Sequence, residues 1–282
     1  MAILDPNQQA ISQLPQEWKP QFASSAHTLA VLGNEVGRST PNLSEHEKEQ
    51  INNAYSESFA NPARFADESL VALIQQAGAL LAELANMSRS EFLAPAVVAP
   101  TARSIIEQSS LIMFLCDAED SQMRLARTAR ATKKAIDEED YFKTLPPVIE
   151  LRRGLSSVVD TYNSKHRRKP IRVPEKKSEL VALQLPWIDG RKLYSELCGY
   201  THHNAFNSFY SWLVAQNNPT GAEITALFFC LCAARAFTDS IAKASAYRRE
   251  EEIASHMQTI ATAVEQLEGL WTDASNLEQK LA

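Results

Sequence analysis

Glycine is scarce in this sequence: it accounts for only 8 of the 282 residues, against about 7% in an average globular protein. Tight hairpin turns and phosphate-binding loops both rely on Gly, because Gly adopts positive φ angles without strain. In addition, no segment alternates polar and apolar residues over the length of a confident strand. These features disfavour all-β folds and the common nucleotide-binding α/β folds, and they predict an all-α, multi-helix bundle.

The overall composition is that of an ordinary globular protein. Hydrophobic residues make up 45% and charged residues 22%, and the formal net charge is −6. These values exclude wholesale disorder and argue against a protein whose whole surface coats nucleic acid. The four cysteines form no Cys-x-x-Cys pair, as expected for reduced thiols in the cytosol. The first 20 residues lack the basic and apolar regions of a secretory signal, so we expect a cytoplasmic protein.

The hydrophobic pattern divides the chain into an arm and one helical domain. Residues 1–20 carry three prolines and little periodicity, which predicts a loose N-terminal arm. Residues 21–282 are expected to form a single domain, with N-terminal helices over about 21–90, a core over about 97–247 and a long C-terminal helix over about 248–280. Three prolines and a charge cluster mark residues 164–186 as a long basic loop within that core.

Several helix starts are indicated by capping residues. Ser44 and Glu47 have the spacing of a capping box, and Asp67 and Thr220 are candidate N-caps of the helices that follow them. The segment from Ile224 to Ala234 is apolar on every face, which is typical of the central helix of a bundle. Since about 20 apolar residues are needed to span a bilayer, we expect a buried core helix and no membrane contact.

Arg103 and Glu107 lie one turn apart on an otherwise apolar segment. With Arg before Glu, and with Arg in the first turn, the order opposes the helix dipole, so the pair does not serve helix propensity. Charged groups among Ile105, Ile106 and Leu111 are expected to be partly buried and to need partners. The pair is therefore either part of a polar-ligand pocket or a salt bridge that joins neighbouring helices.

A second cluster of polar side chains follows later in the chain: Tyr194, Tyr200, His202, His203 and Asn204. Successive helical residues project about 100° apart, so at most one of the two histidines faces the core. An imidazole suits proton transfer or hydrogen bonding near neutral pH, although a buried His bonded to Tyr or Arg is also a common structural feature. The candidate ligand-binding or polar-core residues are Arg103, Glu107, Tyr194, His202 and His203.

Two segments of the chain are strongly basic. Residues 165–177 contain seven Lys or Arg, and a helix over residues 121–136 carries a basic face of Arg124, Arg127, Arg130, Lys133 and Lys134. Such segments either bind phosphates or form ordinary solvated surfaces. Aromatic residues that would stack on bases are missing from both. The phosphate-binding candidates are Arg167, Arg168, Lys169 and Arg172.

Metal and nucleophilic chemistry have little support in the sequence. A di-iron carboxylate bundle needs two Glu-x-x-His motifs, and none occurs. The pair Glu196 and His203 lacks the rest of a ligand set, and there is no Gly-x-Ser-x-Gly elbow. Cys198 and His202 have the spacing of a dyad on one helix face, which coincidence also explains. We expect no metal and no cofactor, and a metal-dependent helical oxidase is the weakest alternative.

Two stretches together resemble a group of bacterial all-helical proteins. They are residues 100–117 (PTARSIIEQSSLIMFLCD), followed by Arg124 and Arg127, and residues 193–204 (LYSELCGYTHHN). The group has a Pro-x-x-Arg-x-x-x-Glu helix and a later Tyr-x-x-Leu-(Ser or Cys) helix that ends in His. It is similar to the HEPN superfamily, named for higher eukaryotes and prokaryotes nucleotide-binding. The resemblance covers about residues 100–245 and implies a HEPN-like helical core, often dimeric, in which certain polar residues meet: Arg103, Glu107, Tyr194 and one of His202 or His203.

Some members of that superfamily are ribonucleases of toxin and defence systems, in which an Arg is followed four to six residues later by His. This sequence departs from the motif, because the nearest Arg before His202 is Arg191, eleven residues away. We therefore expect a helical binding or accessory protein, as a homodimer or with a protein partner. The alternative is a diverged HEPN-type ribonuclease or nucleic-acid-binding protein, in which Arg103 stabilises phosphate charge and a His acts as general acid or base.

Overall fold

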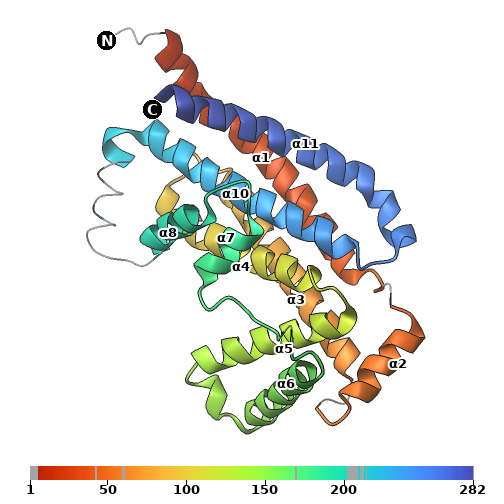
Figure 1. Ribbon diagram of the computed structural model, residues 1–282. Helices are drawn as coiled ribbons and strands as arrows, with labels where there is room; N and C mark the ends of the chain where they lie inside the picture. Colours follow the sequence, from red (N-terminus) through yellow and green to blue (C-terminus); the bar gives the residue numbers. More distant parts are fainter. Residues whose placement is uncertain are drawn as a thin grey trace.

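The computed structural model describes residues 6–281, except residues 42, 59–60, 169, 202–208, 210–212 and 214. This part of the chain is helical almost throughout, which confirms the expected all-α bundle, and its one β contact is an isolated bridge between Pro41 and Arg248. The elements in Figure 1 are α1 (Pro6–Arg38), α2 (Glu45–Ala54), α3 (Pro62–Met87), α4 (Pro95–Cys116), α5 (Ser121–Glu138), the 3-10 helix η1 (Phe142–Thr144), α6 (Pro146–Lys165), α7 (Lys177–Gln184), α8 (Gly190–Thr201), α10 (Pro219–Ser245) and α11 (Glu250–Leu281).

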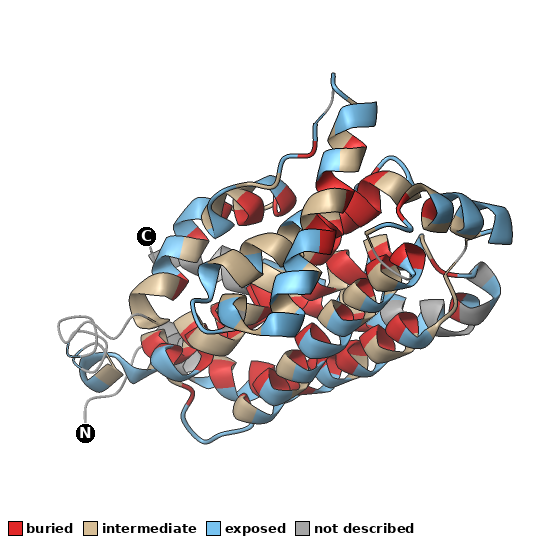
Figure 2. Ribbon diagram, turned by 90° about the horizontal axis from the view of Figure 1, so that it is seen from below, coloured by how far each residue is buried: buried red, intermediate tan, exposed pale blue. Residues whose placement is uncertain are grey.

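α10 is the central helix of the bundle. It packs against α1, α3, α4 and α11, and it buries Phe229, Cys230, Phe237 and Ile241. A helix that is apolar on every face gains most from a position in which every face is removed from water. The core position predicted for the apolar segment of this helix is therefore confirmed, and Figure 2 shows buried residues concentrated inside the bundle.

α1 and α11 run side by side along one edge of the bundle (Figure 1). The expectation of a loose arm over residues 1–20 is wrong from residue 6 onward, because α1 begins at Pro6 and buries Trp18 in the main core. Pro15 and Pro20 both lie inside this helix, where each removes one backbone hydrogen bond. The apolar area that α1 buries against α3, α10 and α11 outweighs that loss.

A smaller core cluster lies between α2, α5, α6 and the start of α3. Tyr55, Leu125 and Val158 are fully buried there. The capping box expected at the start of α2 is confirmed: the backbone N–H of Ser44 donates to Glu47 Oε2 over 2.9 Å, and the N–H of Glu47 donates to the Ser44 hydroxyl over 3.2 Å. This cap fixes where α2 begins beside the cluster.

Asn-Pro pairs begin two of the long helices. Asn61 at the start of α3 and Asn218 at the start of α10 each accept a hydrogen bond from the backbone N–H three residues later. A Pro in the first turn is favourable, because its missing N–H would have no partner there. The predicted caps Asp67 and Thr220 are therefore wrong, since each lies inside a helix that an Asn has already begun.

The basic segment 164–186 is not a loop throughout, as was expected, because α7 occupies residues 177–184. Leu180 and Val181 are buried, and α7 contacts α4 and α8. The two apolar residues stabilise a short helix by packing against a surface from distant parts of the chain. Tertiary contact of this kind overrides the prolines and charges that predicted a loop.

α3 and α10 are long and apolar enough to cross a membrane, judged by length and composition alone. In the most apolar window of α10, 67% of the residues are buried within the fold, and the share in α3 is 39%. The central position of α10 in the bundle accounts for its hydropathy, because a core helix needs the same apolar surface as a membrane-spanning one.

Candidate functional site

Arg103, Glu107 and Tyr194 meet between α4 and α8. The Nε atom of Arg103 donates to Glu107 Oε1 over 2.8 Å, and its Nη2 atom donates to the Tyr194 hydroxyl over 3.1 Å. That hydroxyl donates in turn to Glu107 Oε1 over 2.9 Å, and the guanidinium carbon lies 5.2 Å from the centre of the Tyr194 ring. The structure thus brings together three of the five candidate residues of the predicted polar cluster.

The packing of α4 against α8 explains why these side chains meet. Ile105 and Ile106 are fully buried in the main core and fix the rotation of α4. Leu193 and Leu197, one turn apart, anchor α8 in the same core. Tyr194 follows directly after Leu193 and is held at the α4 side of the helix, where its hydroxyl reaches the charged pair.

Lys177 is the fourth member of this cluster, and it comes from the first turn of α7. Its Nζ atom donates to Glu107 Oε2 over 2.8 Å. The sequence did not indicate this role, because Lys177 was expected to lie in a basic loop that either binds phosphates or is solvated. The available signal was the pair Leu180 and Val181, which follow Lys177 at the spacing of a helix that buries one face.

Burial and hydrogen bonding set the charge state of the cluster. Burial alone would raise the pKa of Glu107, but the hydrogen bonds from Lys177 and Tyr194 and the nearby cations outweigh it, so the pKa is lowered. Burial raises the pKa of Tyr194, and its hydrogen bond to Glu107 raises it further. Burial alone would lower the pKa of Arg103. The hydrogen bond with Tyr194 and the negative charge of Glu107 outweigh burial, so the pKa is raised. The cluster therefore holds an ionised carboxylate beside a protonated phenol at neutral pH.

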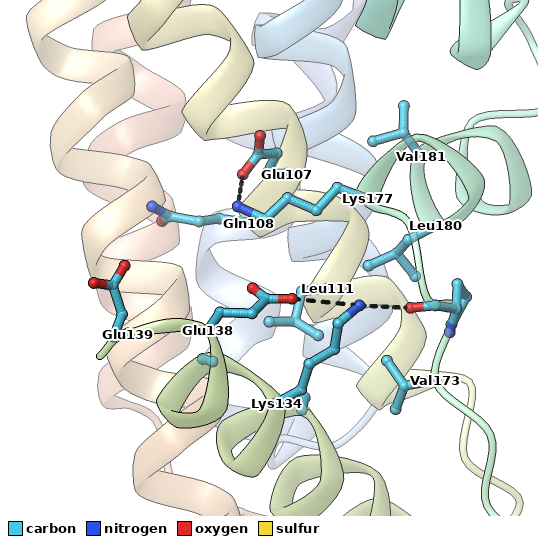
Figure 3. A pocket seen from close by; sticks show the side chains of 13 residues that line it. Glu107, Gln108, Leu111, Lys134, Glu138, Glu139, Val173, Lys177, Leu180 and Val181 are labelled. Carbon is cyan, nitrogen blue, oxygen red and sulfur yellow. Dashed lines mark hydrogen bonds and ion pairs between the residues drawn. The ribbon is translucent and has the colours of Figure 1, made fainter. Parts of the chain in front are cut away.

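A cavity of about 300 Å³ opens beside Glu107, between α4, α5, α7 and the segment that precedes α7. Figure 3 shows that its wall is divided, with carboxylate and amide side chains on one side and branched aliphatic side chains on the other. The polar lining residues are Glu107, Gln108, Lys134, Glu138, Glu139 and Lys177. The aliphatic side is formed by Val173, Leu180 and Val181, with Leu111 between the two sides. We call this space the α4–α5–α7 cavity.

Both lysines that reach the α4–α5–α7 cavity are engaged with protein groups. Lys177 donates to Glu107. Lys134 donates to the carbonyl oxygen of Pro174 over 3.0 Å and to that of Glu175, and it forms an ion pair with Glu138 over 3.8 Å. By contrast, the buried Oε1 atom of Gln108 has no hydrogen-bond partner in the described part of the chain. The cavity therefore offers an incoming molecule more hydrogen-bond acceptors than donors.

The remaining predicted site residues are not brought to this cluster by the described structure. Three of them fall outside the described residues: His202, His203 and Lys169. Arg167, Arg168 and Arg172 are exposed on the connection between α6 and α7. Their phosphate-binding role stays a prediction.

The basic face predicted for residues 121–136 does not form a continuous positive surface. Arg124 is buried, and its guanidinium carbon lies 3.5 Å from the centre of the Tyr247 ring. Arg127 is half-buried and donates to the carbonyl oxygen of Phe114 over 2.5 Å. Helical spacing places these cations on one face, but partners from α4 and from the α10–α11 connection turn two of them inward. This part of the sequence interpretation is wrong for that reason.

Within the described ranges, no three His, Cys, Asp or Glu side chains are placed together to hold a metal ion. The four cysteines are free thiols; Cys116, Cys230 and Cys232 are buried and Cys198 is partly exposed.

No family model matches this chain, and comparisons with curated proteins and with solved structures found no match. The geometry of the cluster and of the adjoining cavity is thus the basis for a functional proposal.

Proposed function

We propose that this protein is a helical binding or accessory protein that takes up a small amphipathic molecule with a protonated amine in the α4–α5–α7 cavity. One observation carries the proposal: a wall rich in hydrogen-bond acceptors faces an aliphatic wall across about 300 Å³. Mostly apolar cavities with a few oriented polar groups are typical of small-molecule sites. The aliphatic wall holds the apolar body of the ligand, and the acceptor wall receives its amine.

The pKa values of the polar cluster favour a role in binding over a role in proton transfer. General acid–base catalysis needs a group whose pKa lies near the working pH, whereas the pKa of Glu107 is lowered and that of Tyr194 is raised. Arg103, Tyr194 and Lys177 hold the Glu107 carboxylate from three sides. Glu107 is therefore a fixed carboxylate at the edge of the cavity, with its charge compensated by Arg103 and Lys177. A group that is already held in place loses little freedom when a ligand binds.

The charge expected of the ligand follows from the cavity-lining groups that have no hydrogen-bond partner among the described residues of the protein. Lys134 donates to two backbone carbonyl oxygens and pairs with Glu138, and Lys177 donates to Glu107. The Gln108 Oε1 atom is buried without a partner in the described structure, and the Glu139 side chain is exposed beside the cavity. A ligand that donates N–H bonds to these oxygens relieves the cost of a buried acceptor without a partner. A carboxylate ligand would instead face the Glu139 carboxylate and would have no N–H to donate to Gln108 Oε1.

Thermal unfolding with hexylamine, hexanol and hexanoate tests this proposal, because the three probes share an apolar body and differ in head-group charge. We expect hexylamine to raise Tm most, hexanol to raise it less and hexanoate to leave it unchanged. Ala135 lines the cavity, so Ala135→Trp should abolish the rise, whereas Ala79→Trp at an exposed position on α3 should preserve it. An equal response to all three probes, or a rise that survives Ala135→Trp, contradicts the proposal.

A diverged HEPN-type nucleic-acid-binding protein or ribonuclease is the second candidate function. The observation in its favour is the exposure of Arg167, Arg168 and Arg172 on a single connection. If these residues contact phosphates, the protein binds single-stranded RNA with an affinity that falls steeply with salt, and the double variant Arg167→Ala/Arg168→Ala binds more weakly. A lack of RNA binding at low salt, together with intact RNA after incubation, rejects this candidate.

We also propose that the chain assembles as a homodimer in the cytoplasm. Light scattering on the purified protein measures the first part of this proposal, and the expected mass is twice the 31.4 kDa of one chain. A mass of one chain at all concentrations contradicts it.

A further inference from the structure

Two arginines are buried together where α3, α5 and the α10–α11 connection meet. Arg248 is 2% exposed and Arg124 is 9% exposed. Arg248 Nη1 donates to Asp67 Oδ1 over 2.8 Å and to the carbonyl oxygen of Ser39 over 3.1 Å. The guanidinium of Arg124 stacks on the ring of Tyr247. Neither side chain follows the usual behaviour of Arg, which keeps its charged end in water.

Three nitrogen atoms of this pair, which together carry four N–H groups, lack acceptors among the described residues. The Nε atom of Arg124 and the Nε and Nη2 atoms of Arg248 are buried and have no hydrogen-bond partner in the described part of the chain. A buried donor without a partner is costly, and more so when it is charged, so native proteins rarely leave several side by side. Three such donor atoms on two neighbouring arginines indicate that groups besides the described side chains accept from them.

The charges around the two arginines do not balance. Among the described residues, Asp67 is the one carboxylate that pairs directly with either of them. The exposed Glu47 carboxylate interacts with Arg124 only at longer range. Asp117 pairs with Lys243, and burial raises the pKa of Cys116 to about 12, so this nearby thiol is neutral. A buried positive charge without a counter-charge is unfavourable in a medium of low dielectric constant. The missing acceptor should therefore carry a negative charge.

A cavity of about 20 Å³ adjoins Arg124, and Arg248 is not among its lining residues. Asp67 and Ser121, the latter in the first turn of α5, are its other polar lining residues, and the rest of its wall is aliphatic. This volume suits a group the size of one water molecule or a small ion. It is too small for a tetrahedral oxyanion with its oxygen ligands. The Asp67 carboxylate at its edge is already engaged by Arg248.

We propose that this cavity binds one small monovalent anion of the halide class, chloride in the cell. The anion accepts hydrogen bonds from the buried Arg124 and neutralises the excess charge of the arginine pair. A water molecule in the same place would satisfy a donor but leave the charge uncompensated. The inference goes beyond the proposed function, since the site is separate from the α4–α5–α7 cavity and its ligand stabilises the fold.

Thermal unfolding of the full chain in sodium chloride, sodium bromide, sodium gluconate and sodium sulfate at equal ionic strength tests the proposal. Chloride and bromide should raise Tm by roughly 2–6 °C relative to gluconate, with saturation, because they bind the folded state alone. Sulfate should not reproduce the saturable effect. Equal Tm values in chloride and gluconate overturn the proposal and indicate that the cavity holds water.

A variant pair and a direct measurement locate the effect. Arg124→Met should remove the chloride dependence of Tm, while Arg130→Met, at an exposed Arg on the same helix, should retain it. If Arg124→Met does not fold, crystals of the unaltered protein grown in bromide decide the question. An anomalous bromide peak beside Arg124 supports the site, and a map without a peak there overturns it.

Discussion

Lys19 and Glu223 form a buried ion pair, with Lys19 Nζ 2.9 Å from Glu223 Oε1, although 204 residues separate them in the chain. Lys19 also donates to the carbonyl oxygens of Ser90 and Glu91 over 3.0 and 2.9 Å, so each of its three N–H groups has an acceptor. Glu223 accepts in addition from the backbone N–H of Leu93 over 3.1 Å. The pair therefore joins α1, α10 and the connection from α3 to α4 at one point.

Lys19→Met should lower the free energy of unfolding by about 3–5 kcal/mol, because it leaves the Glu223 charge buried without its counter-charge. Urea unfolding measures the change. Arg64→Ala serves as the control, since it breaks an exposed ion pair with Glu68 and should cost less than about 1 kcal/mol. A loss for Lys19→Met no larger than that of the control contradicts the role given to this pair.

Glycine to alanine substitutions in α1 and α11 should change stability in opposite directions. A Cβ atom on Gly33 would lie 2.9 Å from Phe237 Cε1 and closer still to Cζ, so Gly33→Ala overpacks the core and should destabilise by about 1–3 kcal/mol. A Cβ atom on Gly269 meets nothing within 4 Å, so Gly269→Ala should stabilise by about 0.5–1 kcal/mol. Thermal unfolding of both variants checks the signs, and a stabilising Gly33→Ala would refute the packing of α1 on α10.

Tyr194→Phe should destabilise the fold by about 1.5–3 kcal/mol, because the lost hydroxyl bonds two charged groups, Arg103 and Glu107. A double-mutant cycle with Glu107→Gln isolates the interaction between Tyr194 and Glu107. We expect a coupling free energy of about 0.5–3 kcal/mol. Strict additivity of the two substitutions would show that the hydrogen bond contributes nothing to stability.

The stability contributed by Glu107 should disappear in acid. Folding lowers the pKa of this carboxyl group from its ordinary value of 4.5. Its contribution is therefore present above about pH 4.5 and is lost as the pH falls through the lower pKa of the folded state. The difference in unfolding free energy between the unaltered protein and Glu107→Gln should be constant near neutral pH and shrink below about pH 4.5. Urea titrations across this range test the prediction, and a difference independent of pH down to about 3 contradicts it.

One thiol should react much faster than the others in the native protein. Burial raises the pKa of Cys116 to about 12 and also raises that of Cys230, and the thiolate is the reactive form. Cys198 is the partly exposed cysteine. With Ellman's reagent, Cys198 should react first and the three buried thiols only after unfolding. A fast-reacting thiol in native Cys198→Ser would contradict the burial of the other three.

Local patterns in the sequence were enough to predict most helices but not all of their ends. The capping box of Ser44 and Glu47 needs only four residues and is present as predicted. At the start of α3, Asn61 and Asp67 are both acceptable caps, and the Pro after Asn61 decides between them. Asp67 instead pairs with Arg248, 181 residues away, a contact that no local pattern indicates.

The residues of the candidate site likewise divide into those that the local sequence indicates and those that only the fold brings to the site. Charged groups on an apolar segment need partners, and this argument indicates Arg103 and Glu107. That Tyr194 meets them was expected only from the family resemblance. The three side chains do contact one another. Lys177 was missed because its partner Glu107 lies 70 residues away, and an exposed Lys and a paired Lys look alike in a sequence. The aliphatic wall of the cavity likewise exists only when α4, α5 and α7 converge.

By itself, the sequence determined that this chain forms helices, which of them is apolar on every face, and which charged pair sits on an apolar segment. These properties depend on residue spacing over one or two helical turns and on the dihedral preferences of single residues. Only the tertiary structure decided that Lys19, Arg124 and Arg248 are buried and that Arg168 stays in water. The exposure of a side chain depends on which helices pack around it, and that packing joins residues far apart in the chain.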